Sequence, residues 1–172
     1  MEMLESWDRF VCKIATKEEI LKRFDYEISI HSDGEKNNWL MWKDECVNMP
    51  EWKRISYFGF LDDFVICEAT AAISSDACQN MEDLIDDKTA YLFAFRTNIE
   101  FRWKWYFSKL FNFMVDDLKS RWYEQAILWV EPNEIENKKI YFHYGFNKYL
   151  KTGIEKNPDG TKTTVEYYKK YL

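Results

Sequence analysis

The 172-residue chain is poor in the residues that mark several classes of protein. It has only two histidines, and none of its four cysteines belongs to a Cys-x-x-Cys pair, so a metal site is not expected. No uncharged apolar run approaches the ~20 residues that a membrane helix needs. The acidic N-terminus, residues 1–5, lacks the apolar core of a signal peptide. We therefore expect a cytoplasmic protein with reduced thiols, no metal and no membrane partner.

Basic residues are also in short supply. The chain has 30 acidic and 24 basic residues, which gives a net charge of −6. Nucleic-acid binding depends on basic side chains that neutralise phosphates, and no basic stripe runs along this sequence. We therefore do not expect a nucleic-acid partner.

Glycine is scarce and aromatic residues are abundant. The chain has only five glycines, where average usage would give about twelve. Aromatic residues make up 19% of the chain and include eight tryptophans. The hydrophobic share of 47% and the charged share of 31% are ordinary for a globular protein. No repeat or linker divides the chain, so we expect a single domain over residues 1–172.

Seven segments have the apolar or alternating patterns of strands. Residues 90–95 are six apolar residues in a row, which is typical of a central strand covered on both faces. Leu61-Asp62-Asp63 separates two strand patterns and predicts an antiparallel hairpin. The turn residues 157–160 separate the last two patterns. The predicted strands are 9–15, 55–60, 64–73, 90–95, 126–130, 146–151 and 163–168.

Helical patterns lie between these strands. Thr16 and Glu19 have the spacing of a capping box, and an apolar helical face follows to Ile28. Asp33-Gly34 is expected to end this segment as a turn. The remaining expectations are a short helix or ordered loop at 38–52, a loop at 74–89, and helices at 104–121 and 134–144, the last ended by Gly145. Buried strands that alternate with helices predict an α/β protein with a mixed sheet.

The most informative stretch is the central strand, its outgoing turn and the helix that follows. A helix N-terminus leaves several amides unpaired at the positive end of the helix dipole. Arg102 and Lys104 add positive charge at the same place. This unit therefore predicts a binding site for an anion.

Three segments together carry a family pattern. They are the turn Arg102–Tyr106 with helix Phe107–Leu118, the strand Ala126–Val130 followed by Glu131-Pro132-Asn133, and the ending Ile140–Phe146. With these segments the chain resembles the GNAT superfamily of N-acetyltransferases, whose ending reads Leu-Tyr-x-x-x-Gly-Phe. The resemblance implies a GNAT-like α/β fold, with a mixed, mostly antiparallel central sheet of about six or seven strands flanked by about four helices.

The resemblance also implies an activity. It is transfer of an acetyl group from acetyl-CoA to a primary amine of a small molecule or peptide, by direct attack on the thioester. The turn would hold the pyrophosphate, the strand edge at 95–97 would pair with the pantetheine arm, and Tyr141 would protonate the leaving thiolate. The expected cofactor-binding residues are Phe95, Arg96, Thr97, Arg102, Trp103, Lys104, Trp105, Tyr106, Phe107, Asn133 and Asn137.

The general base is less clearly marked. Glu68 lies in an otherwise apolar strand, and a carboxylate in apolar surroundings binds a proton more readily, which suits a base. The alternative is that Glu68 faces solvent. Glu100 and His143 are weaker candidates. Acceptor recognition has two candidate features. One is a set of aromatic residues that could hold a cation (Trp39, Trp42, Trp52, Tyr57 and Phe58), and the other is a set of acidic residues that could attract an amine (Glu82, Asp83, Asp86 and Asp87).

Tryptophan stands at four positions where the family usually has glycine: 103, 105, 122 and 129. Glycine accepts positive φ, whereas a residue with a Cβ pays about 1–2 kcal/mol for it. We therefore expect weakened acetyl-CoA affinity, unless the indoles point to solvent while the amides keep their positions. The alternative function is a catalytically impaired GNAT-fold binding module with a blocked pyrophosphate cradle. A homodimer formed through exposed aromatic residues is compatible with either function.

Overall fold

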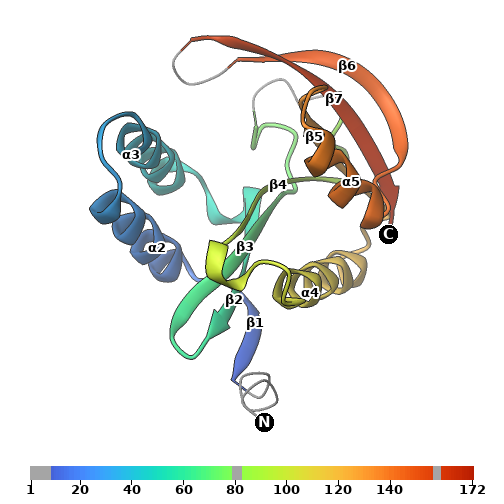
Figure 1. Ribbon diagram of the computed structural model, residues 1–172. Coiled ribbons are helices and arrows are strands. Elements are labelled where there is room, and N and C mark those ends of the chain that lie inside the picture. Colours follow the sequence, from blue (N-terminus) through green and yellow to red (C-terminus); the bar gives the residue numbers. More distant parts are fainter. Residues whose placement is uncertain (1–8, 79–82, 157–159) are drawn as a thin grey trace. The chain divides into compact units, whose positions relative to one another are not determined.

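Figure 1 shows the computed structural model of the chain, which describes residues 9–78, 83–156 and 160–172. The chain divides into two compact units, Met1–Ala71 with Ala94–Asp117, and Ala72–Phe93 with Leu118–Leu172. A seven-stranded sheet has the order β1-β2-β3-β4-β5-β7-β6, and the described residues include four α-helices. The predicted fold class, with six or seven strands and four helices, is confirmed.

The first unit begins with three neighbouring strands. β1 (Phe10–Ile14) runs antiparallel to β2 (Arg54–Leu61), with Phe10 opposite Leu61. β3 (Phe64–Ala72) follows β2 after Asp62 and Asp63, and Asp62 takes a positive φ of 55° in this turn. The predicted hairpin is therefore confirmed.

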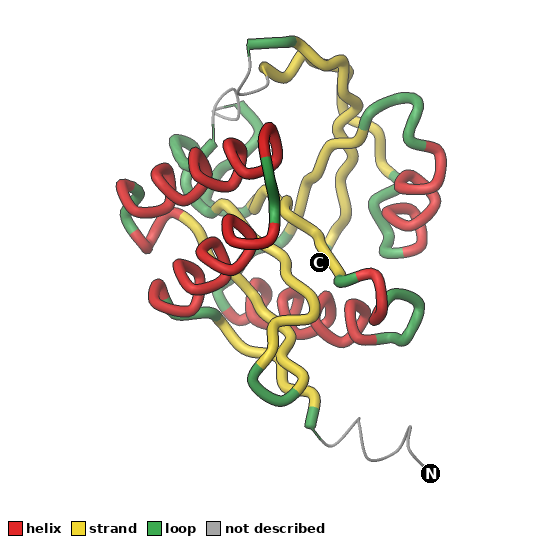
Figure 2. Tube along the Cα trace, turned by 60° about the vertical axis from the view of Figure 1, so that its left-hand side comes forward, coloured by secondary structure: helices red, strands yellow, loops and turns green. Residues whose placement is uncertain are grey.

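Two helices, α2 (Lys17–Ile30) and α3 (Asp33–Asn48), pack against each other in the same unit (Figure 2). The predicted capping box begins α2: the Glu19 amide donates to Thr16 Oγ1 at 3.3 Å, and the Thr16 amide donates to Glu19 Oε2 at 2.9 Å. The short 3-10 helix η1 (Glu51–Lys53) follows α3 and leads into β2.

The predicted turn at Asp33-Gly34 is wrong. Helix α2 ends at Ile30, three residues before Asp33, because His31 takes an extended conformation, and Ser32 precedes the first turn of α3. Asp33 and Gly34 are the first two residues of α3. An acidic residue is favourable beside the positive end of a helix dipole, so Asp33 suits a helix start as well as a turn.

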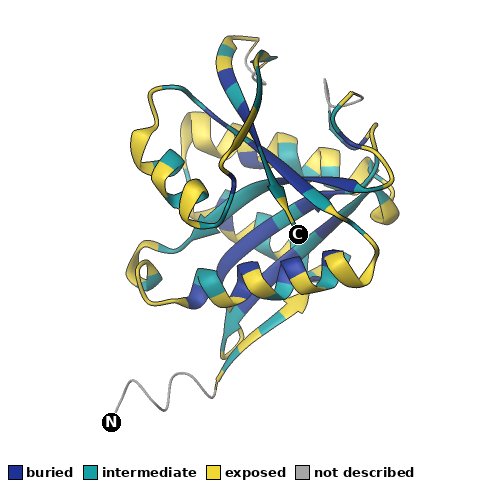
Figure 3. Cartoon of the chain, turned by 90° about the vertical axis from the view of Figure 1, so that its right-hand side faces the viewer, coloured by how far each residue is buried: buried dark blue, intermediate teal, exposed yellow. Residues whose placement is uncertain are grey.

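Strand β4 (Thr89–Thr97), the short helix η2 (Ile99–Phe101) and helix α4 (Tyr106–Ser120) form the predicted strand–turn–helix unit. Leu110, Met114 and Leu118 are completely buried along one face of α4, at the spacing of successive helical turns. Figure 3 shows that buried residues are concentrated on the strands. None of the described helices has the length and apolar character needed to cross a membrane.

The second unit holds the other strands. β5 (Gln125–Val130) pairs in parallel with the start of β4 and antiparallel with β7 (Lys162–Tyr171), which in turn pairs antiparallel with β6 (Lys148–Lys156). Helix α5 (Ile135–His143) precedes β6 and is followed by Gly145 with a positive φ of 92°, as predicted. The core of this unit contains Ala72, Ala77, Ile85, Tyr91, Ile127, Val165 and Tyr167.

The last two predicted strands, at 146–151 and 163–168, are shorter than β6 and β7. Phe146 is completely buried but precedes β6, and the ladder with β7 continues through polar residues to Lys156. The predicted strands were too short because they were placed by their apolar residues. The polar remainder of β6 and β7 is held by backbone hydrogen bonds, which leave no apolar pattern in the sequence. Of the predicted turn 157–160, only Gly160 lies within the described residues, with a positive φ of 85°. None of the four cysteines forms a disulfide.

Candidate active site

The turn between η2 and α4 has the backbone of a glycine-rich loop. Trp103 and Trp105 take φ values of 65° and 66°, in the left-handed region that favours glycine. Their side chains are 87% and 67% exposed. The turn therefore keeps a glycine-type path while both indoles lie largely in solvent.

Two cations flank this turn. Arg102 Nε donates to the carbonyl oxygen of Thr97 at 3.1 Å, which ties the turn to the end of β4. The Lys104 ammonium lies 5.6 Å from the centre of the Phe101 ring. Trp105 contributes its carbonyl oxygen to the first turn of α4, accepting from the Lys109 amide at 3.1 Å. An anion at the start of α4 would meet amide donors, the helix dipole and two exposed basic residues.

The end of β4 lies beside this turn in the first unit. The ladder between β4 and β5 ends at Tyr91 opposite Ile127, and β4 continues to Thr97. Within that continuation Ala94 takes a positive φ of 55°, which interrupts the regular pleat. The Phe95 ring lies 5.3 Å from the Phe107 ring. The structure thus brings together the predicted strand edge 95–97 and the predicted turn 102–107.

Glu68 lies in β3 and is buried. Its carboxylate accepts from Arg23 Nε at 2.9 Å and from Arg96 Nη1 at 2.7 Å. Arg23 also pairs with Glu27, another buried carboxylate, one helical turn along α2. No sequence pattern predicted that Arg23 and Arg96 reach Glu68. The signals in the sequence are i,i+4 spacings, such as those of Arg23 with Glu27 and of Glu27 with His31.

Two of the aromatic residues proposed for a cation site surround a cation of the chain itself. The Arg96 guanidinium carbon lies 4.6 Å from the ring centre of Trp39 and 5.1 Å from that of Trp42. Tyr57 and Phe58 are core residues, and the Tyr57 hydroxyl donates to Asp117 at 2.7 Å.

The other proposed acceptor residues lie on the surface. Trp52 is exposed. Asp83 pairs with Lys151 at 2.5 Å, and Asp86 accepts from the Lys88 amide at 2.9 Å. Glu82 and its predicted role lie outside the described residues.

Tyr141 belongs to α5, in the second unit. Burial raises the pKa of its phenol, and the negative charge of Glu134 raises it further. A tyrosine phenol is protonated at neutral pH even at its ordinary pKa of about 10, so Tyr141 carries the proton that a donor needs, and burial makes it a weaker acid. Asn137 lies half-buried on the same helix, and exposed Asn133 precedes it, with its carbonyl oxygen accepting from the Ile135 amide at 2.9 Å.

No family model and no curated protein matches the sequence. Solved structures do match the fold. A probable acetyltransferase from Staphylococcus epidermidis superposes with a TM-score of 0.70 at 13% identity, over 95% of this chain and 99% of that one. The chain has the fold of the GNAT acetyltransferases.

Two further GNAT structures were determined with a ligand. The PaiA N-acetyltransferase of Thermoplasma acidophilum, in complex with coenzyme A, has a TM-score of 0.62 at 13% identity, over 95% of this chain and 99% of that one. A GNAT acetyltransferase from Elizabethkingia anophelis, with acetyl-CoA bound, has a TM-score of 0.60 at 12% identity, over 96% of this chain and 99% of that one. At these identities the likeness concerns the fold alone.

The other two tryptophans at positions where the resemblance predicted glycine differ from each other. Trp122 follows α4 with a φ of 70° and has the left-handed backbone of Trp103 and Trp105. Trp129 lies within β5 opposite Tyr167, half-buried against the core of the second unit. Its backbone is not left-handed, so a side chain there needs space but causes no backbone strain.

The weaker base candidates in this GNAT fold are both at the surface. Glu100 is exposed in η2. His143 is exposed at the end of α5, with its ring 5.4 Å from that of Tyr144. Burial therefore distinguishes Glu68 from both of them.

Proposed function

We propose that this chain is an N-acetyltransferase that uses acetyl-CoA to acetylate a primary amine of a small molecule or a peptide. The observation that carries the proposal is the turn of the GNAT fold at residues 102–105. Its backbone has positive φ at Trp103 and Trp105, and the two indoles are exposed rather than buried in the turn. The residues present therefore fit a pyrophosphate, despite the missing glycines.

Acetyl-CoA would be held by residues of the first unit. Arg102, Lys104 and the amides at the start of α4 would bind the pyrophosphate through charge-assisted hydrogen bonds. The β4 edge at Phe95–Thr97 would lie along the pantetheine arm. When bound, acetyl-CoA supplies an acetyl group activated as a thioester.

Two side chains are proposed to move protons. Tyr141 would donate a proton to the leaving thiolate, since a tyrosine phenol is protonated at neutral pH. Glu68 would take the proton of the attacking amine. Its carboxylate accepts from Arg23 on one oxygen and from Arg96 on the other, which leaves a lone pair on each oxygen for the proton.

Calorimetric titration of coenzyme A tests the cradle. We expect binding by the wild-type chain, and about tenfold tighter binding when Trp103 and Trp105 are both replaced by glycine. Tenfold corresponds to about 1.4 kcal/mol. Left-handed tryptophans cost about 1–2 kcal/mol each, and this strain weakens binding to the extent that the free loop relaxes and the bound loop does not. The matched control is Trp122→Gly, which relieves the same kind of strain at the opposite end of α4 and should leave the Kd unchanged. Equal dissociation constants for the wild type and the double variant would contradict the strain argument.

Turnover tests the enzyme against the alternative of a binding module. Thiol release from acetyl-CoA is measured with polyamines, aminoglycosides and peptides, alongside thermal unfolding with coenzyme A. A ligand that binds only the native state must raise the unfolding temperature. No shift at millimolar coenzyme A, together with no thiol release, would favour the impaired module with its blocked cradle.

A further inference from the structure

The Arg96 side chain is held in place by its neighbours, but few of its N–H donors take part in hydrogen bonds. Its Nη1 donates to Glu68 at 2.7 Å, and among the described residues its guanidinium makes no other hydrogen bond or ion pair. An arginine carries more N–H donors than this one bond uses. The Arg96 side chain is 35% exposed, whereas that of Glu68 is 6% exposed. Donors of a charged group are therefore left for a ligand that reaches it from solvent.

The surroundings of Arg96 fix its orientation. Trp39 and Trp42 lie 4.6 and 5.1 Å from the guanidinium carbon, and the two indoles meet each other at 86°. Cation–π contact with both rings, added to the bond with Glu68, restricts the rotamers of the side chain. A guanidinium fixed in this way loses little further entropy when it binds a carboxylate through two parallel hydrogen bonds.

The neighbouring carboxylates already have partners. Glu68 accepts from Arg23, whose side chain is only 10% exposed. Glu27 pairs with Arg23 and with His31 Nε2 at 2.8 Å, while His31 Nδ1 lies 2.6 Å from Glu35. Of the two arginines that donate to Glu68, Arg96 is thus the exposed one: its side chain is 35% exposed, whereas that of Arg23 is 10% exposed. Arg23 has a second buried carboxylate to neutralise, whereas Arg96 keeps donors that face solvent.

We propose that Arg96 binds a carboxylate of the acceptor, so that the substrates are amines that also carry a carboxylate, with free amino acids as the simplest class. The inference rests on the proposed acetyl transfer. Arg96 lies between Phe95 and Thr97, on the strand segment proposed to hold the pantetheine arm. An acceptor anchored there would sit one residue away from the path of the acetyl donor.

Matched pairs of acceptors test the proposal. Each pair is an amino acid and its decarboxylated amine: phenylalanine with 2-phenylethylamine, tryptophan with tryptamine, and lysine with cadaverine. We expect kcat/KM to be at least about tenfold higher for the amino acid, which is the low end for a hydrogen bond to a charged group. In R96Q this ratio should fall to about one, mainly through a higher KM for the amino acid.

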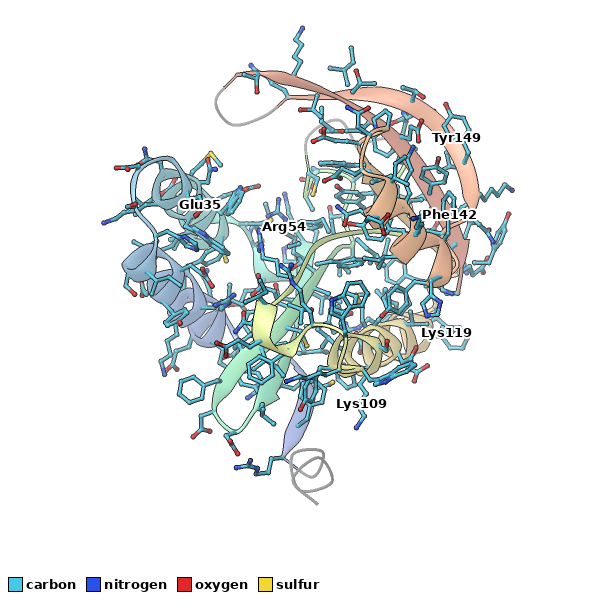
Figure 4. The ribbon with its side chains drawn as sticks, in the orientation of Figure 1. Glu35, Arg54, Lys109, Lys119, Phe142 and Tyr149 are labelled. Atoms are coloured by element: carbon cyan, nitrogen blue, oxygen red, sulfur yellow. The ribbon has the colours of Figure 1, made fainter. Side chains whose placement is uncertain are left out.

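Two further variants keep the result interpretable. R96K retains the charge near Glu68 but lacks the planar fork, so it should recover only part of the ratio and serves if R96Q folds poorly. R54Q removes another partly buried arginine of the first unit, one that pairs with Glu45 at 2.6 Å, and should leave the ratio unchanged (Figure 4).

Four results would overturn the proposal. The first two are a ratio near one in the wild type and a ratio that R96Q leaves intact. The third is an R96Q effect that appears equally in the affinity for coenzyme A, and the fourth is binding of coenzyme A without acetylation of any amino acid of the panel. Failure of the proposed function looks different, because the wild type would then neither bind coenzyme A nor release thiol with any amine.

Discussion

Replacing Trp122 with glycine should stabilise the protein. Trp122 follows α4 with a φ of 70°, its amide donates to the Lys119 carbonyl at 2.9 Å, and the Tyr123 amide donates to the Leu118 carbonyl at 3.1 Å. This pair of bonds defines a Schellman helix end, whose left-handed residue is usually glycine. The indole is 79% exposed, so little packing is lost with it.

The magnitude follows from two opposing terms. The left-handed backbone costs a residue with a Cβ about 1–2 kcal/mol, and glycine returns about 0.5–1 kcal/mol of this through its greater freedom in the unfolded chain. The net gain for Trp122→Gly is therefore about 1 kcal/mol, or about 2–4 °C in Tm for a chain of this size. Urea unfolding followed by far-ultraviolet circular dichroism measures it without relying on tryptophan fluorescence.

Trp122→Ala is the control for this experiment. It removes the same indole but keeps a Cβ, so the backbone strain remains and the free energy of unfolding should stay within about 0.5 kcal/mol of the wild type. If the glycine and alanine variants are equally stable, the strain at residue 122 is not what limits stability and the reasoning is refuted.

Three more outcomes are expected. Thr16→Ala removes the hydroxyl that accepts from the Glu19 amide and should cost about 1 kcal/mol in chemical denaturation, whereas Thr16→Ser keeps the cap and should cost less. The hydrogen bond from Lys138 holds the pKa of Glu166 below its usual 4.5, so this pair stabilises the fold above that pH and the contribution disappears as the pH falls through the lowered value. Unfolding free energies between about pH 5 and pH 3 should accordingly fall less steeply in Glu166→Gln, and identical slopes would contradict the assignment. Tyr141→Phe should lower kcat about 10²-fold with little change in the KM for acetyl-CoA, and an unchanged kcat would remove Tyr141 from the mechanism.

Local signals in the sequence predicted most of the fold. The capping box at Thr16 and Glu19 is a contact between residues three apart, and the apolar run at 90–95 reports burial directly. The turn predicted at Asp33-Gly34 was wrong because the same residues favour both a turn and the start of a helix. Only the packing of the surrounding chain decides between these outcomes.

The candidate site was predictable to the extent that it is local. A family pattern that expects glycine at 103, 105 and 122 identified three positions whose backbone is left-handed. The network around Arg96 was not predictable, because Glu68 meets partners 28 and 45 residues away in sequence. Arg96 was expected only to pair with the pantetheine arm through its backbone. Nothing in the sequence indicated that Trp39 and Trp42 would flank its side chain.

The order of the strands also bears on self-association. β1 and β6 stand at the two ends of that order, and an edge strand offers backbone groups to which a strand of another molecule can bond. Here both edges carry lysines, Lys13 on β1 and Lys148, Lys151 and Lys156 on β6. Such charges oppose the growth of a sheet across molecules. Copies of this chain are therefore expected to resist aggregation through their strand edges, and a dimer would have to form through other surfaces.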